Sequence, residues 1–118
     1  MKMIFIYYPS CSTCKKALKT LKEHDAIVEI RHIVEDTPTA EELKAWIMQS
    51  GEPFTKFFNT HGVLYKEMGL KERVKNMNIE EAVALLAGNG MLIKRPLLIT
   101  EDKVLVGFKE DDYKQLLK

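Results

Sequence analysis

The stretch YYPSCSTCKKA, residues 7–17, holds both cysteines of this 118-residue chain, Cys11 and Cys14, in a C-x-x-C arrangement. The β-branched and aromatic run Lys2–Tyr8 precedes the pair and stops at a proline and a serine, which predicts a buried first strand followed by a turn. From Ser12 onward, small or apolar residues recur at helical spacing with lysines on the opposite side, which predicts an amphipathic helix. The two cysteines are therefore expected at the junction of a strand and a helix.

Three further strands and a last helix are predicted outside the middle of the chain. Ala26–Val34 alternates apolar with polar residues, as a strand with one covered face does, and the helix before it favours parallel pairing with the first strand. Leu97–Thr100 and Val104–Gly107 are close enough to form an antiparallel hairpin. Glu110–Lys118 begins with acidic residues and ends with a basic one, which matches the dipole of a short helix.

The middle of the chain is predicted to be helical. A capping box, in which a glutamate follows a threonine or asparagine by three residues, occurs at Thr39–Glu42 and again at Asn78–Glu81. The first of these helices is expected to close at Ser50-Gly51. Between the two helices, Phe54–Lys75 predicts one or two short helices interrupted by glycines.

Length and composition indicate one globular domain. The chain is 46% hydrophobic and 30% charged, and its 18 basic and 17 acidic residues leave a net charge of +1, so no nucleic-acid or membrane partner is expected. The order of elements predicts an α/β fold in a single domain, 1–118, with a core formed by 1–34 and 91–118 and a helical insertion at 35–90. No apolar run is long enough for a signal peptide or a membrane span, so we expect a cytoplasmic protein.

A C-x-x-C pair at the start of a helix favours redox chemistry. The free backbone N–H groups and the positive end of the helix dipole stabilise a thiolate on Cys11, and Lys15 and Lys16 add to the positive field. The thiol pKa in such settings falls from about 8.5 to between roughly 3.5 and 7.5. Cys14 lies one turn further on, where it can attack a mixed disulfide on Cys11. We therefore predict that Cys11 is the nucleophile and Cys14 the resolving thiol.

Three other uses of the cysteines have less support. Zinc needs two more ligands, but the chain has no second cysteine pair and His24 and His32 are too far apart for the usual histidine spacing, so no metal is expected. Inert buried cysteines would not require Cys11 to follow a proline-serine turn. A purely structural disulfide is disfavoured in a reducing cytoplasm.

Six segments along the chain, from the cysteine pair to the C-terminal region, carry a resemblance to a known family: PSCSTCKKA, TAEEL, FFNTHG, YKEMGL, KRPLLI and VLVGFKEDDY. The chain resembles the arsenate reductase (ArsC)/Spx/MgsR family of thioredoxin-like proteins over nearly its whole length. The resemblance implies a thioredoxin-like, glutaredoxin-type mixed sheet of β-α-β and β-β-α halves with an inserted helical subdomain. It also implies that Cys11 is the redox-active thiol and that Arg95, followed by a cis Pro96, lies beside it.

Arg95 completes the predicted catalytic set of Cys11, Cys14 and Arg95. Its planar guanidinium suits an oxyanion, a carboxylate or a thiolate, while a surface salt bridge is the alternative use. The NTHG segment could place polar groups over the thiol, or it could be only a loop. The predicted substrate-binding residues are Ser12, Thr13, Asn59, Thr60 and Pro96.

The sequence also departs from the arsenate-reducing members of this family. Those proteins use an arginine triad, and this chain matches only the Arg95 member, because the other two neighbourhoods read FTKF, with Lys56, and GFKE, with Lys109. Arsenate is therefore not the expected substrate. Cys14 makes the chain more similar to the Spx branch of redox-sensing regulators, and Gly51 lies near a glycine that this branch uses to contact RNA polymerase, although a helix end also explains it.

Three functional hypotheses follow from these residues. The first is a cytoplasmic thiol–disulfide redox protein, reductase-like, with no bound cofactor and with glutathione, glutaredoxin or thioredoxin as thiol donor. The second is an Spx-like regulator in which the disulfide of the C-x-x-C pair controls binding to the RNA polymerase alpha subunit. The third is a redox-inert family relative that serves only as an interaction module.

Overall fold

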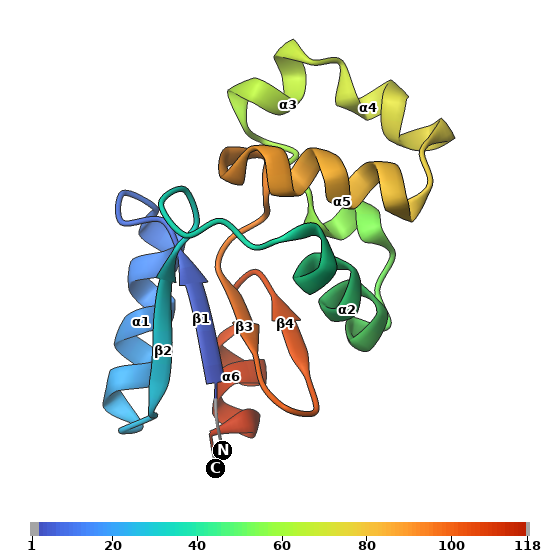
Figure 1. Cartoon of the computed structure of the whole chain (residues 1–118). Coiled ribbons are helices and arrows are strands. Elements are labelled where there is room, and N and C mark those ends of the chain that lie inside the picture. The colour runs from blue at the N-terminus through green and yellow to red at the C-terminus, as the bar shows by residue number, and fades with distance from the viewer. Residues whose placement is uncertain (1–2, 118) are drawn as a thin grey trace.

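The computed structural model describes residues 3–117 and shows a four-stranded mixed sheet with helices around it (Figure 1). The strands are β1 (Met3–Tyr7), β2 (Val28–His32), β3 (Leu97–Ile99) and β4 (Val104–Val106). They lie in the order β2-β1-β3-β4, with β1 and β2 parallel and the other two pairs antiparallel. The mixed sheet, the parallel first pair and the hairpin are therefore confirmed. Lys2 and Lys118, which the sequence assigns to terminal elements, lie outside the described residues.

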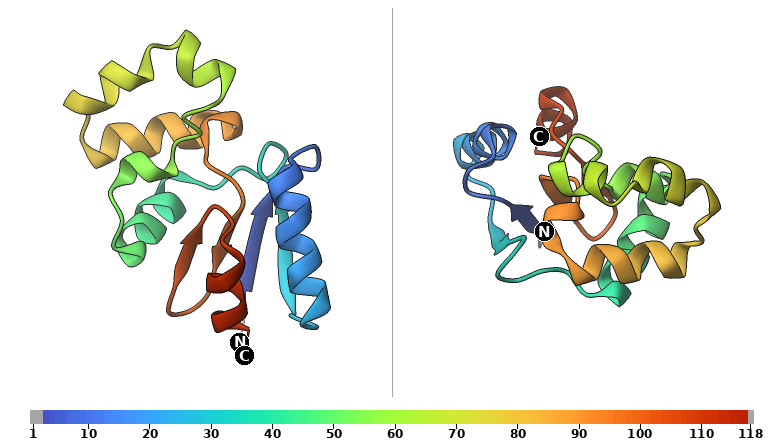
Figure 2. Two further views of the ribbon diagram at one scale, coloured as in Figure 1. Left: turned by 180° about the vertical axis from the view of Figure 1, so that it is seen from behind. Right: turned by 90° about the horizontal axis from the view of Figure 1, so that it is seen from above.

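One face of the sheet is covered by α1 (Ser12–Glu23) and α6 (Glu110–Leu116), which Figure 2 shows on the same side. Phe5 lies in the middle of this face, between Ile30 of β2 and Leu98 of β3, and is fully buried. The apolar stripe of α1 packs here through residues such as Leu21, and its lysines are exposed. Burial of this stripe holds the first turn of α1 at the end of β1.

The opposite face of the sheet packs against helices from the middle of the chain. Ile6 and Leu97 point to this side and join the larger hydrophobic core, which includes Leu43, Phe57 and Leu86. All five of these side chains are fully buried, so the helical segment is packed onto the sheet through apolar contacts. Its proposed bounds, residues 35 and 90, stay a prediction.

The middle segment contains four α-helices and three short 3₁₀ turns within the described residues: α2 (Ala40–Ser50), η1 (Phe54–Phe57), α3 (Val63–Glu67), α4 (Leu70–Arg73), η2 (Val74–Asn76), α5 (Ile79–Gly88) and η3 (Gly90–Leu92). Both predicted capping boxes are present, at the starts of α2 and α5. Gly51 ends α2 in the left-handed conformation, with a φ of 72°, so the helix-end explanation of this glycine is confirmed. No helix among residues 3–117 is long and apolar enough to cross a membrane.

The expectation that β2 covers its apolar side chains and exposes its polar ones was wrong at Ile30 and Arg31. Ile30 is 46% exposed, whereas Arg31 is only 9% exposed. β2 is an edge strand, so Ile30 lies at the rim of the α1 face, and Arg31 lies on the other face, next to Ile6. There Arg31 donates two hydrogen bonds to Glu42 of α2, at 2.7 and 3.1 Å, and this pairing makes its burial tolerable.

Replacing Glu42 by glutamine tests this link between sheet and insertion. The amide can keep the capping-box contact to Thr39 but loses the charge that pairs with Arg31, so we expect a loss of about 1–2 kcal/mol in the free energy of unfolding, limited by the partial exposure of Glu42. Urea denaturation measures it, with the exposed Glu41→Gln as control.

The same variant has a pH signature. Arg31, the largest cause, lowers the pKa of Glu42, so the stabilisation from the carboxylate is present above its unfolded pKa of about 4.3 and is lost as pH falls through the lower folded value. The stability difference between wild type and Glu42→Gln should therefore shrink on acidification below about pH 4. A difference that is constant with pH, or equal to that of Glu41→Gln, would contradict the role of this ion pair.

Candidate active site

Cys11 is the N-cap residue of α1, with φ −83° and ψ 117°. Its backbone N–H donates to the Tyr8 carbonyl at 3.0 Å, which closes the turn after β1. Its sulfur accepts a hydrogen bond from the Cys14 backbone N–H at 3.3 Å. The thiol thus occupies the place where serine or aspartate usually caps a helix, and it meets the unpaired N–H groups of the first turn.

The two thiols differ in burial and in acidity. Cys11 is partly exposed, whereas the Cys14 side chain is fully buried. Burial works against ionisation of Cys11, but the hydrogen bonds from Cys14 and the charge of Arg95 outweigh it, so the pKa of Cys11 lies below its ordinary value. Burial and the hydrogen bond to Cys11 raise the pKa of Cys14 to about 12. The accessible thiol is therefore the acidic one.

Arg95 lies beside this thiol, and its peptide bond to Pro96 is cis, as the family resemblance implied. The guanidinium carbon is 5.1 Å from the centre of the Tyr8 ring, and one guanidinium nitrogen reaches the Met91 carbonyl at 3.5 Å. Among the described residues Arg95 forms no salt bridge, so the alternative of a surface ion pair is not what the structure shows. Its charge remains available to an anion.

The predicted substrate-binding residues do not all come together. Ser12 and Thr13 are exposed in the first turn of α1, next to Cys11. Pro96 is buried, and its carbonyl accepts a hydrogen bond from Gly107 at 2.9 Å. Ser12 and Thr13 thus adjoin Cys11 along the chain and Pro96 adjoins Arg95, and their contact with a substrate stays a prediction.

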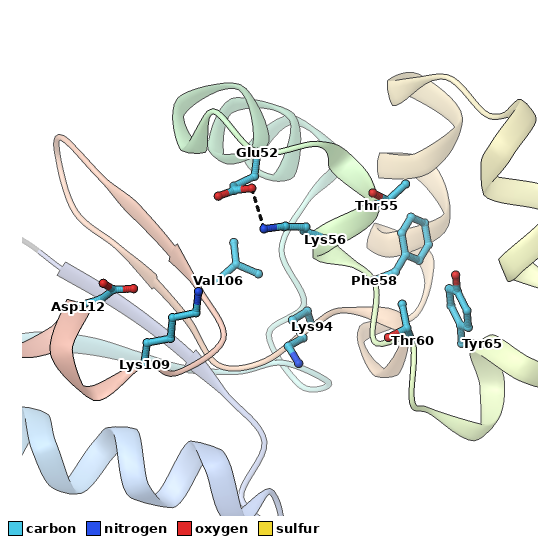
Figure 3. Close-up of a pocket in the computed structure, with 10 residues that line it drawn as sticks. All are labelled: Glu52, Thr55, Lys56, Phe58, Thr60, Tyr65, Lys94, Val106, Lys109 and Asp112. Carbon is cyan, nitrogen blue, oxygen red and sulfur yellow. Dashed lines mark ion pairs between the residues drawn. The ribbon is translucent and has the colours of Figure 1, made fainter.

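Asn59 and Thr60, although adjacent in sequence, line different hollows. Asn59 shares a hollow of about 540 Å³ with Arg95 and His61. Thr60 lines a separate hollow of about 450 Å³ together with Lys94 (Figure 3). The sequence treated the NTHG segment as one polar loop, whereas the structure divides it between two surfaces on either side of the Lys94–Arg95 step.

Tyr8 is a functional-site neighbour that the sequence analysis missed. The sequence pattern predicts only that it ends the first strand, yet its carbonyl accepts the hydrogen bond that closes the turn before Cys11 and its ring packs against Arg95. The ring of His32 packs edge-on against it, with 5.7 Å between centres, which fixes its orientation. An aromatic residue directly before the proline of the cysteine turn was the available signal.

The described residues supply thiols and an arginine to this site and no cluster of metal ligands. Between residues 3 and 117, no group of three or more histidine, cysteine, aspartate or glutamate side chains converges. Cys11 and Cys14 are free thiols, and the Cys14 backbone binds the sulfur of Cys11. The arrangement can therefore present one stabilised thiolate to a partner, with a second thiol one helical turn away.

A mixed sheet with a C-x-x-C pair at the start of α1 and a cis proline before β3 defines a thioredoxin-like thiol protein. The chain belongs to the ArsC family, whose model matches residues 6–116.

Relatives from bacteria support this membership. The chain is 49% identical to the uncharacterised protein YusI of Bacillus subtilis, over 98% of both proteins. It is 30% identical to the regulatory protein MgsR of the same organism, over 99% of this chain and 91% of that protein. Among solved structures, an ArsC family related protein from Bacteroides fragilis matches with a TM-score of 0.94 and 55% identity, over 100% of this chain and 98% of that one.

The acidity of Cys11 can be measured by its rate of alkylation with iodoacetamide as a function of pH. We expect the inflection of the wild-type profile below the ordinary thiol pKa, and an upward shift in Arg95→Gln, because a positive charge that favours the thiolate is removed. Arg95→Lys keeps the charge and should lie closer to wild type. An Arg95→Gln profile that coincides with wild type would show that Arg95 does not act on the thiol.

Proposed function

We propose that this protein is a thiol–disulfide oxidoreductase of the cytoplasm, in which Cys11 attacks and Cys14 resolves. The observation that carries the proposal is the contrast within the pair: the partly exposed thiol has the lowered pKa, and the buried thiol has the raised one. A nucleophile must be accessible and ionised, whereas a resolving thiol needs to react only with its neighbour.

The proposed reaction begins with the Cys11 thiolate attacking one sulfur of a substrate disulfide. The substrate S–S bond breaks, one half leaves as a thiolate, and the other half remains joined to Cys11. Cys14 then gives up its proton and attacks the Cys11 sulfur, which releases the second half as a thiol and leaves a Cys11–Cys14 disulfide. The substrate has gained two electrons and the protein has lost two. Two further thiol equivalents from a donor restore the reduced pair.

Formation of the mixed disulfide changes the acidity of the second thiol. The hydrogen bond to Cys11 contributes to the high pKa of Cys14, and this contribution ends once Cys11 is bonded to the substrate and no longer carries charge. Cys14 therefore ionises more readily in the mixed disulfide than in the reduced protein. In the reduced protein the Cys14 thiol therefore stays protonated, and it becomes reactive only after the mixed disulfide on Cys11 has formed.

The remaining roles concern recognition. Arg95, held over Tyr8 without an ion-pair partner among the described residues, is proposed to hold an anionic group of the substrate or to stabilise the leaving thiolate. Glutathione, glutaredoxin and thioredoxin are the proposed electron donors. Arsenate remains disfavoured as substrate, because Arg31 is committed to Glu42 on another face and only Arg73 is left.

A redox-sensing regulator is the second candidate, and the similarity to MgsR, named a regulatory protein, favours it. The proposed partner is the RNA polymerase alpha subunit. Gly51 is exposed at the end of α2, where a partner could reach it, although its left-handed conformation has a local cause. In this case oxidation of Cys11 and Cys14 would change a binding surface rather than a substrate.

Cysteine variants test the oxidoreductase proposal in steady-state assays coupled to glutathione or thioredoxin. Cys11→Ser should lose turnover completely. Cys14→Ser should still attack but stop at the mixed disulfide, which mass spectrometry detects as the mass of half the substrate added to Cys11. If the folded wild-type protein turns over no disulfide, the oxidoreductase proposal is rejected.

Pull-down with the polymerase alpha C-terminal domain, with and without oxidant, separates the two candidates. Redox-dependent binding together with no turnover would favour the regulator. Absence of binding in both redox states would remove it. Cys14→Ser is the matched variant, because it keeps the reactive thiol but cannot form the disulfide.

A further inference from the structure

A hollow lined by Lys94, the residue before Arg95, brings together three lysines from separate parts of the chain (Figure 3). Lys56 belongs to η1, Lys94 to the loop before the cis proline, and Lys109 precedes α6. The hollow measures about 450 Å³, which lies within the range of small-molecule sites, and lies where the sheet meets the inserted helices. It lies one residue from Arg95.

Backbone hydrogen bonds hold the three segments around this hollow. The Lys94 N–H donates to the Phe57 carbonyl at 2.8 Å, which fixes η1 against the loop that carries Lys94. The Gly107 N–H donates to the Pro96 carbonyl at 2.9 Å, which fixes the segment leading to Lys109 against the same loop. The positions of the lysine backbones are therefore set by the fold, and only their side chains need to order around a ligand.

The side chain of Lys94 packs close to the backbone of Gly107. A Cβ atom at Gly107 would lie 3.4 Å from the Cε of Lys94, so the lysine stem lies close against the glycine backbone. Gly107 also has a φ of 78°, a conformation that favours glycine. The stem of Lys94 thus runs along the wall of the hollow, and its exposure is intermediate.

The charges in the hollow are unbalanced. Lys56 pairs with Glu52 at 3.0 Å, but neither Lys94 nor Lys109 has a carboxylate within ion-pair distance among the described residues. Asp112 also lines the hollow. Other described lysines, such as Lys71 and Lys103, also have no acidic partner, so what distinguishes Lys94 and Lys109 is that they come from different segments and line one hollow. Two lysines without acidic partners on the lining of one hollow give it a positive field that attracts an anion.

We propose that this hollow binds a small molecule with at least two carboxylate or phosphate groups, and that it holds the anionic part of the disulfide substrate. A ligand with two anionic groups can place one against Lys94 and one against Lys109, which come from different segments. The substrate assignment rests on the proposed oxidoreductase function, whereas the binding of a polyanion does not.

Binding is tested without redox chemistry in the Cys11→Ser background. Isothermal titration with citrate and with pyrophosphate, neither of which carries sulfur, should show saturable binding, and the comparison distinguishes carboxylate from phosphate ligands. The double change Lys94→Gln/Lys109→Gln should weaken binding by at least about fivefold. Lys71→Gln/Lys103→Gln removes the same net charge from exposed sites outside the hollow and should leave the affinity within about twofold of the parent.

The substrate assignment is tested in the protein with both cysteines intact. The rate constant of Cys11 with 5,5′-dithiobis(2-nitrobenzoate), a disulfide with two carboxylates, should fall in Lys94→Gln/Lys109→Gln, whereas the rate with the neutral 2,2′-dipyridyl disulfide should not. Lys94→Arg/Lys109→Arg should restore the anionic rate, which a folding defect would not allow.

The outcomes are separable. Equal binding in the hollow variant and the control variant, or no saturable binding of either anion in the millimolar range, would overturn the site while leaving the thiol chemistry intact. Binding with an equal loss of both disulfide rates would overturn the substrate assignment. Binding in a protein that turns over no disulfide would reject the oxidoreductase and leave a polyanion site.

Discussion

The hydrogen bond from the first turn of α1 to the sulfur of Cys11 is the contact on which the chemistry of this protein depends. A helix start leaves several N–H groups without partners, and here a thiol accepts from one of them where an oxygen usually does. A thiolate is the better acceptor, so the fold favours the charged form of Cys11. The same turn buries Cys14, because its spacing places it on the apolar stripe of the helix. One local motif therefore produces both the acidity of the first thiol and the protection of the second.

The loop from residue 92 to 96 makes this motif part of a larger surface. Its backbone bonds to the insertion through Asn59 and Phe57, and to the hairpin through Gly107. Arg95 and Lys94 are consecutive in this loop and serve different hollows, one shared with Asn59 and the other with Lys109. The insertion thus contributes to recognition, because its backbone hydrogen bonds hold in place the loop that carries Lys94 and Arg95.

Much of the fold could be predicted because the relevant signals are local. The strand before the cysteines, the helix after them, both capping boxes and the glycine that ends α2 depend on residues within one or two turns of each other. The position of Cys11 as a helix cap followed from the same kind of signal. The boundaries were less accurate at strand ends: Ala26–Val34 was expected and Val28–His32 is observed, because pairing with β1 decides where β2 stops.

The sequence by itself determined which residue types lie at the start of α1 and which elements the chain forms, because caps, turns and helical periodicity act over three or four residues. Only the tertiary structure decided that Arg31 is buried and Ile30 exposed, that Tyr8 supports Arg95, and that Asn59 and Thr60 face different hollows. It also brought Lys56, Lys94 and Lys109 together from three segments. These outcomes depend on which side of a packed sheet each segment meets, and no local spacing specifies the partner on the far side of a core.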